Sequence, residues 1–445
     1  MEVINLIPSF GGLAYTVLAF VAALIIIVFV HEYGHYIVGR WSGIHAEVFS
    51  IGFGPVLWSG FDKRGTRWQI AALPLGGYVR FLGDSNASSV GQSAAVDGLT
   101  AEQRRATMTG APLWARTATV AAGPVFNFVL SIGIFAGIFL WNGIATDVPT
   151  VGSVRGLPAQ TVALQPGDRI EALGGIETPD FASFMAAAGD LPVEAVVDYR
   201  VERNGADVAL RDSHPLPPVV ETVQPDSAAR DAGLLPGDVI LSVNGEPVVT
   251  FPHLREIVGA SDGQPLTLLL ARDGKEMELT LTPRRVDLPR AEGGFETRWL
   301  IGLTGALYFE PETRQPGLVE SLGLGATQSW QIATTSLSGL WHMVTGAISS
   351  CNLRGPIGIA ETSGAAASAG ATSFIWFIAM LSTAVGLMNL FPVPVLDGGH
   401  LVFYAYEAVT GKQPSARALQ VLMAVGLTAI LTLMVFALSN DLFCP

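Results

Sequence analysis

Two histidines and a glutamate near the start of the chain are spaced for metal-dependent hydrolysis. The segment His31-Glu-Tyr-Gly-His35 has the pattern H-E-x-x-H. On a helix, residues four apart lie on the same face, so His31 and His35 can bind one Zn²⁺ ion. Glu32 would lie beside the ion and could take a proton from the water that the ion activates. Chance occurrence of the pattern on a helix is the alternative, so its setting matters.

The motif follows directly on an apolar segment. Residues 13–30 contain no charged side chain, and as a helix they would be roughly 27 Å long, about the thickness of the hydrocarbon core of a bilayer. The segment lacks the basic start and the cleavage site of a signal peptide, so we interpret it as a retained membrane span. Ionisable groups at that depth usually serve a function. We therefore expect one zinc ion at this motif.

A catalytic zinc site needs a third protein ligand and an open position for water. The candidate is Asp397, in a stretch (388–401) where Pro392 and Pro394 cannot continue a regular helix. Broken backbone at membrane depth is tolerated where it lines a cavity, and such a break would let the carboxylate point inward. His400, one helical turn further on, is the competing ligand. A carboxylate at the water interface is the structural alternative for Asp397.

The composition predicts a polytopic membrane protein. Half of the 445 residues are hydrophobic and 14% are charged, whereas a soluble protein usually carries about 25% charged residues. Apolar stretches predict four spans, at residues 8–40, 112–142, 371–397 and 414–438.

The charge distribution predicts the orientation. Residues 40–116 contain eight Lys and Arg against five Asp and Glu, while residues 142–370 contain 15 against 28. Because Lys and Arg accumulate in cytoplasmic loops, we place 40–116 inside and the acidic segment outside, with both termini. An acidic chain without a basic patch also argues against nucleic acid as a partner.

The outer segment contains an internal repeat. Residues 164–175 (LQPGDRIEALGG) match residues 234–245 (LLPGDVILSVNG) at an offset of 70. Each copy alternates short apolar strands with glycine-containing turns and one helical stretch. We therefore expect two small α+β domains, at 148–214 and 215–286, and their turn sequences resemble those of bacterial protease-associated PDZ domains.

The chain as a whole resembles the site-2 protease family of intramembrane zinc metalloproteases, in particular its bacterial RseP-type (regulator of sigma-E protease) branch. HEYGH matches the HExxH motif of that family, and residues 389–398 (NLFPVPVLDG) match its NxxPxPxLDG motif. The order of the spans, with tandem PDZ units between the second and third, also fits. The resemblance covers nearly the whole chain and implies that Asp397, rather than His400, is the third ligand.

The resemblance also implies a substrate-binding strand. Within 44–85, residues 51–58 and 69–84 look like the membrane-re-entrant β hairpin of the family, with Gly76, Gly77 and Tyr78 near the active site. A transmembrane helix must unwind before it can be cut, and an edge strand offers new partners to its backbone. An ordinary cytoplasmic hairpin is the alternative.

Three further residues are candidates for substrate binding. Asn389 and Pro392 belong to the NxxPxPxLDG motif, and Asn127 ends a GxxxN-like element of the second span that starts at Gly123. Asn127 either hydrogen-bonds near the site or only packs between helices.

The remaining segments are less specific. The polar composition of residues 86–111 predicts a flexible cytoplasmic loop. The moderately apolar composition of residues 315–362 predicts a helical region that lies on the outer membrane face or packs on the repeats. Cys351 and Cys444 would pair if both face an oxidising compartment, and are otherwise free thiols.

We thus expect a polytopic α-helical membrane protein with four transmembrane helices, a re-entrant β hairpin and two periplasmic PDZ-like α+β domains. The resemblance implies a zinc metalloendopeptidase in the inner membrane of a Gram-negative bacterium. Its substrates would be single-pass proteins already cleaved on the outer side, such as an anti-sigma factor, and also remnant signal peptides.

A catalytically inactive PDZ scaffold is the alternative, against which the intact Glu32 argues. A metal transporter is a third reading, but transporters usually carry ligands along several spans.

Overall fold

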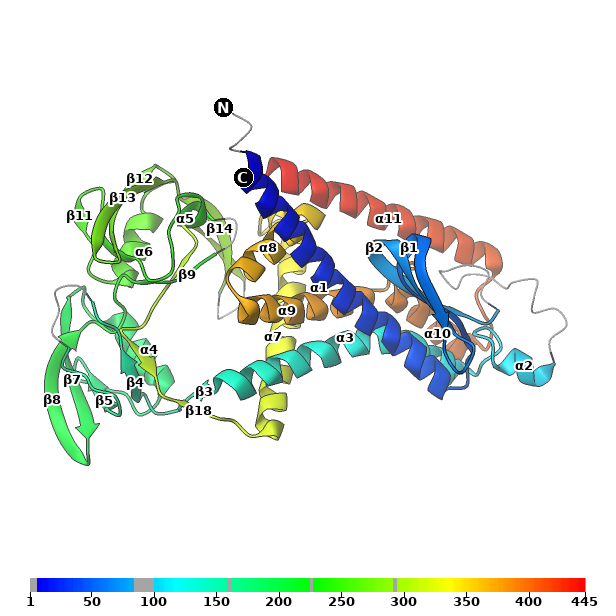
Figure 1. Ribbon diagram of the computed structural model, residues 1–445, viewed down its shortest axis with the longest axis horizontal. Helices are drawn as coiled ribbons and strands as arrows, with labels where there is room; N and C mark the ends of the chain where they lie inside the picture. Colours follow the sequence, from blue (N-terminus) through cyan, green and yellow to red (C-terminus); the bar gives the residue numbers. More distant parts are fainter. Residues whose placement is uncertain (1–5, 84–99, 158–161, 225–226, 291–293, 445) are drawn as a thin grey trace. The chain divides into compact units, whose positions relative to one another are not determined.

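The computed structural model describes residues 6–83, 100–157, 162–224, 227–290 and 294–444 (Figure 1). The chain forms two compact units. The first, here called the helical unit, contains residues up to Ile138 together with Val319–Trp341 and Ser350–Cys444. The second, called the strand-rich unit, contains Phe139–Leu318 and His342–Ser349. Most of the loop predicted at 86–111 lies outside the described residues.

Four helices are long and apolar enough to cross a membrane, judged by length and composition. They are α1 (Leu6–Trp41, apolar from Gly12), α3 (Leu113–Asn142), α9 (Ala371–Asn389) and α11 (Ala416–Phe443). They agree with the four expected spans. Large apolar side chains point away from the protein along these helices, among them Leu18, Val129 and Val421, which is the pattern of helices that face lipid.

The third apolar span stops where the prolines predict. Helix α9 ends at Asn389, seven residues without regular helix follow, and α10 (Asp397–Thr410) begins at Asp397. A Cβ atom at Gly398 or Gly399 would collide with the backbone of residues 390–394. The two glycines after Asp397 therefore allow the chain to turn tightly onto α10.

A curled sheet packs beside α1. Its strands are β1 (Ala46–Phe61) and β2 (Arg67–Phe81), and residues 48–51 of β1 pair with 67–70 on one side and with 77–80 on the other. Residues 77–81 therefore form one edge of this sheet, whose segments follow in the order 56–61, 67–71, 46–51, 77–81.

The turn between β1 and β2 is tied to the end of α1. The Asp62 carboxylate accepts hydrogen bonds from the backbone N–H of Arg64 and Thr66 and from the Tyr36 hydroxyl, and pairs with Arg40 at 3.2 Å. Burial opposes ionisation of Asp62, but these hydrogen bonds outweigh it and lower its pKa to about 2. The charged Asp62 thus fixes the sheet relative to the helix that carries HEYGH.

A further long helix packs on α3 through small residues. Helix α7 (Leu318–Val344) runs across α3 (Figure 1), and a buried row of Ser321, Gly325, Ser329 and Ala333 repeats every four residues. The Ser329 hydroxyl lies 3.0 Å from that of Ser131 on α3. Such rows let helices approach closely in membranes. The expected helix in 315–362 is therefore present, and its place on the membrane surface stays a prediction.

The end of α11 is clamped to the segment that precedes α8 (Pro356–Ser368). Cys444 forms a disulfide with Cys351, which decides between the two alternatives for these cysteines. The Asp441 carboxylate accepts hydrogen bonds from the backbone N–H of Gly355, Ile357 and Gly358 at 2.8–3.1 Å and so caps α8.

The strand-rich unit contains two halves of the same topology, which confirms the repeat. In the first half, β5 (Arg169–Leu173), β6 (Ile176–Glu177), β7 (Val196–Arg203) and β8 (Ala206–Ser213) lie in the order β6-β5-β7-β8 with helix α4 (Phe181–Asp190). In the second, β10 (Val239–Val243), β11 (Glu246–Pro247), β12 (Leu266–Arg272) and β13 (Lys275–Leu281) repeat this order with helix α6 (Phe251–Gly259).

Equivalent side chains stabilise both halves. The buried carboxylate of Asp168 pairs with Arg203 at 2.6 Å, and Asp238 pairs with Arg272 at 2.7 Å. The turn after β5 holds Gly174 at φ 57°, and the matching turn after β10 holds Asn244 at φ 51°. Glycine and asparagine both tolerate this left-handed conformation, so the replacement of Asn by Gly between the copies keeps the same turn.

Strands beyond residue 286 complete both halves. After the hairpin of β14 (Arg284–Pro289) and β15 (Phe295–Leu300), β16 (Leu303–Gly305) pairs with β9 (Val220–Val223), and β17 (Phe309–Pro311) pairs with β4 (Val151–Val154). Tyr308 and Phe309 are buried in the core of the first half. Strands β16 and β17 follow both copies of the repeat along the chain and are not part of the repeated sequence. The repeat pattern therefore does not predict them.

Candidate active site

Three potential metal ligands converge in the helical unit. His31 and His35 lie one turn apart on α1, and Asp397 is the first residue of α10. The Asp397 Oδ2 atom is 3.2 Å from His31 Nε2 and 3.5 Å from His35 Nε2, and the two Nε2 atoms are 3.2 Å apart. Two ligand atoms on a tetrahedral zinc ion lie about 3.3–3.4 Å apart. The triangle of atoms therefore has the size that zinc requires.

The hydrogen bonds around this cluster leave lone pairs on its nitrogen and oxygen atoms, as the binding of a cation requires. His35 Nδ1 donates to the Thr119 carbonyl at 2.8 Å, so in a neutral imidazole its Nε2 atom carries a lone pair. Asp397 Oδ2 is buried and has no hydrogen bond within the described residues. Lone pairs that face one another without a proton between them repel, and a metal ion removes this repulsion.

Asn127 of α3 contacts the other histidine. Its side chain is fully buried, and its amide lies 3.1 Å from His31 Nδ1. The amide nitrogen faces the imidazole, and Oδ1 has no partner among the described residues. With the amide turned over, Oδ1 accepts the His31 Nδ1 proton and leaves Nε2 free for a metal. Asn127 therefore hydrogen-bonds beside a potential ligand, one of the two expected alternatives, and its role in substrate binding stays a prediction.

Glu32 faces the edge of the curled sheet. The backbone of Val79 lies next to the Glu32 carboxylate. A Cβ atom at Gly77 would lie 2.9 Å from Glu32 Cγ, so only glycine lets the strand approach this closely. Backbone groups alternate in direction along a strand, so Val79 points toward the site while Tyr78 points toward its partner Ser50.

These groups line one cavity of about 210 Å³. His31, Glu32, His35 and Asp397 lie on it with the predicted Gly77 and Tyr78. Gly76 precedes this stretch, and a Cβ atom there would meet the ring of Phe53. Asn389 and Pro392 are not among the lining residues, and the Asn389 side-chain amide donates to the Val385 carbonyl at 3.0 Å.

Sequence reasoning did not single out several residues of the cavity. They are Thr119, Met108, Phe81, Val120 and Tyr404, and they stand beside His400, which was considered only as a ligand. One signal was present in the sequence, because Asp397, His400 and Tyr404 follow at helical spacing and therefore share one face of α10.

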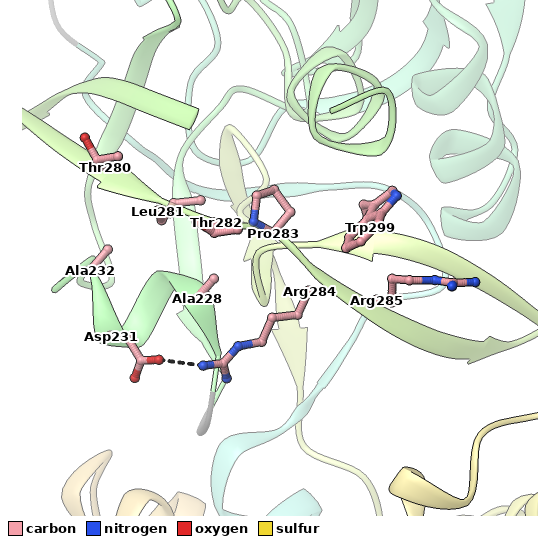
Figure 2. Close-up of a pocket in the computed structure, with 10 residues that line it drawn as sticks. All are labelled: Ala228, Asp231, Ala232, Thr280, Leu281, Thr282, Pro283, Arg284, Arg285 and Trp299. Carbon is pink, nitrogen blue, oxygen red and sulfur yellow. Dashed lines mark hydrogen bonds and ion pairs between the residues drawn. The ribbon is translucent and has the colours of Figure 1, made fainter. Parts of the chain in front are cut away.

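A larger cavity, of about 640 Å³, lies in the strand-rich unit and shares no lining residue with the candidate metal site. Figure 2 shows its ionisable side chains, with Arg284 paired to Asp231 of α5 (Ala228–Asp231) and Arg285 beside Trp299. The one carboxylate that lines it is already paired, so this cavity offers no set of groups for hydrolysis.

Comparison with known proteins shows the family of this chain. A model of the peptidase family M50 matches residues 19–433. The chain is 38% identical over 434 residues to a protein named as a zinc metalloprotease in Rhizobium meliloti (strain 1021), with 97% of both chains covered. It is 33% identical over 461 residues to the regulator of sigma-E protease RseP of Salmonella typhimurium (strain 14028s), with 97% of this chain and 99% of that protein covered. The chain therefore belongs to peptidase family M50, the site-2 proteases, and is a zinc metalloprotease.

Proposed function

We propose that this protein cleaves peptide bonds within transmembrane segments, with His31, His35 and Asp397 as zinc ligands and Glu32 as the general base. The observation that carries this proposal is the convergence of the three ligands at 3.2–3.5 Å beside Glu32, at the end of an apolar helix. A bound zinc ion would acidify a water molecule and polarise the scissile carbonyl.

The protein's own groups carry the proton and orient the site. Glu32 takes a proton from the attacking water and returns it to the leaving amine. Thr119 and Asn127 hold the Nδ1 sides of the two imidazoles, so that both rings keep their Nε2 atoms on the site. The base thus stands within the same cavity as the ligands.

We propose that residues 77–81 bind the substrate as an added strand. Their outer edge lies against Glu32, and an unwound helix must find new partners for its backbone N–H and C=O groups. A substrate with Gly or Pro near the scissile bond should therefore be cut faster than an all-Leu helix, since less helix must be undone.

We further propose an orientation with both termini, the strand-rich unit and the disulfide on the outer, periplasmic side of an inner membrane. The Cys351–Cys444 disulfide supports this side for the end of α11, because disulfides persist in oxidising compartments. The two halves of the strand-rich unit would act as PDZ domains that screen substrates. The relative named regulator of sigma-E protease supports an anti-sigma factor, cut outside beforehand, as the substrate class.

The deciding experiment compares wild type with Glu32→Gln on a model transmembrane substrate in detergent, with zinc measured in both. We expect one zinc per chain in each protein and cleavage by wild type alone. Equal cleavage by both would reject Glu32 as the base. Zinc without cleavage in wild type would favour a PDZ scaffold, and release of zinc across a vesicle membrane would favour transport.

A further inference from the structure

We propose that His400 is a second catalytic residue, which donates a hydrogen bond to the scissile carbonyl oxygen as that oxygen gains negative charge. This inference rests on the proposed roles of Glu32 and of the three zinc ligands. It assigns to His400 a contact with substrate and not with metal.

The position of His400 on α10 supports this role. It follows Asp397 by three residues, so its side chain leaves the same helix face as the proposed ligand. It lines the cavity that also holds Glu32 and the edge residues Gly77 and Val79. A substrate strand laid along that edge would enter the cavity in which His400 stands.

The imidazole of His400 is available for a substrate. Within the described part of the chain, its ring contacts Phe403 edge-on, with centroids 6.0 Å apart, and no hydrogen bond engages either ring nitrogen. The histidine ligands differ, because Thr119 and Asn127 occupy their Nδ1 atoms. A polar ring with free nitrogens in a reactive cavity suits a group that finds its partner only when substrate binds.

His400 is placed apart from the ligand cluster. The ligand atoms of His31, His35 and Asp397 all lie within 4.8 Å of one another, and His400 is not part of that group. A catalytic metal also keeps one position open for water. A fourth protein ligand would fill that position, so a role toward the substrate is the better account of this residue.

The chemistry gives the donor a specific task. When water attacks the carbonyl carbon, the C=O double bond becomes a single bond and its oxygen takes up the electron pair. An N–H aimed at that oxygen stabilises the charge more than it stabilises the uncharged substrate, so it raises the rate without tightening binding of the substrate.

The test uses the full-length, zinc-loaded protein with His400→Ala and His400→Gln. In each variant, zinc content, kcat and KM on a transmembrane substrate are measured, together with the affinity for a phosphinic peptide, which mimics the charged tetrahedral state. Binding of uncleaved substrate is measured in the Glu32→Gln background. The control is His45→Gln, since His45 is exposed and is not among the residues that line this cavity.

We expect His400→Ala to keep its zinc and its KM, to lose about 10²–10³-fold in kcat, and to bind the phosphinic peptide more weakly by a similar factor. His400→Gln, which keeps an N–H donor, should recover part of both losses. Loss of zinc in both variants, or a kcat within twofold of wild type in His400→Ala, would overturn the proposal. A failure of Glu32 as the base would show separately, as cleavage by the Glu32→Gln variant.

Discussion

Gly123 of α3 lies directly against the imidazole of His35 on α1. A Cβ atom at this position would collide with His35 Nε2 and lie 2.9 Å from His31 Cε1. The first residue of the GxxxN-like element is a glycine because the two imidazole rings occupy the space where a side chain would go. The close approach of α3 also brings Thr119 and Asn127 to the Nδ1 atoms of the same rings.

We predict that Gly123→Ala displaces the imidazoles and lowers zinc affinity by at least 10–100-fold, the usual cost of disturbing the surroundings of a ligand. Zinc content after dialysis against a chelator measures this effect. The matched control is Gly137→Ala on the same helix, where a Cβ meets nothing within 4 Å. That control should be neutral or slightly stabilising. Equal zinc retention in the two variants would contradict the packing argument.

Asp397→Ala should lower zinc occupancy and activity more than His400→Ala does. Asp397 Oδ2 lies 3.2 and 3.5 Å from the two Nε2 atoms, while His400 stands outside this triangle. Metal analysis of the two purified variants is the measurement. If His400→Ala strips the metal and Asp397→Ala retains it, the two assignments must be exchanged.

Proline at Val79 should reduce turnover of a helical transmembrane substrate while zinc is retained. Proline lacks the N–H that points from the sheet edge into the site. Proline at Tyr78 should also reduce turnover, but for another reason, because it removes a hydrogen bond to the Ser50 partner inside the sheet. Hydrogen exchange of residues 46–51 separates the two variants, since only the second should expose this segment. Full activity of both would leave the hairpin as a structural element only.

A bidentate ion pair between α3 and α10 should hold the helix that carries Asp397. Arg116 donates to Glu407 at 2.7 and 3.0 Å, and the side chain of Arg116 is 8% exposed. Glu407→Ala leaves this cation without its carboxylate partner, and removal of one member of a buried pair costs about 3–5 kcal/mol. We expect a lower thermal midpoint in detergent. Asp198→Ala is the control, because its pair with Arg211 is exposed and is worth about 0–1 kcal/mol.

The strand-rich unit should lose stability as the pH falls from about 6.5 to about 4. His214 is 2% exposed, and burial lowers its pKa to about 4. Its Nδ1 atom accepts a hydrogen bond from the Leu216 N–H, which requires the unprotonated ring. The unfolded chain binds a proton below its pKa of about 6.5 and the folded chain does not, so stability is present above that pH and is lost through this window, by roughly 3 kcal/mol.

The measurement for His214 is the opening free energy of residues 195–224 from hydrogen exchange, corrected for the intrinsic pH dependence of exchange. His214→Asn, which has no group that titrates in this range, provides the reference. A pH dependence that is the same in wild type and in His214→Asn would show that other groups cause it.

Much of the architecture follows from local patterns in the sequence. The apolar stretches predict α1, α3, α9 and α11 because lipid-facing helices need an uninterrupted apolar surface. Pro392 and Pro394 predict the break before α10, because proline cannot donate in a helix. The repeat at an offset of 70 predicts two similar halves, and both are present with the same strand order. The spacing of His31 and His35 already places both rings on one face of a helix.

The tertiary structure decided which of these distant parts meet. Three contacts at the site depend on how helices and a sheet edge pack together. They are the approach of Asp397 to His31, the close packing of Gly123 against His35, and the approach of Val79 to Glu32. The pairing of Cys351 with Cys444 and the return of β16 and β17 into the two halves of the strand-rich unit are likewise contacts between distant segments. Such contacts arise from the complementary shapes of several elements at once, and periodicity within one element contains no information about them.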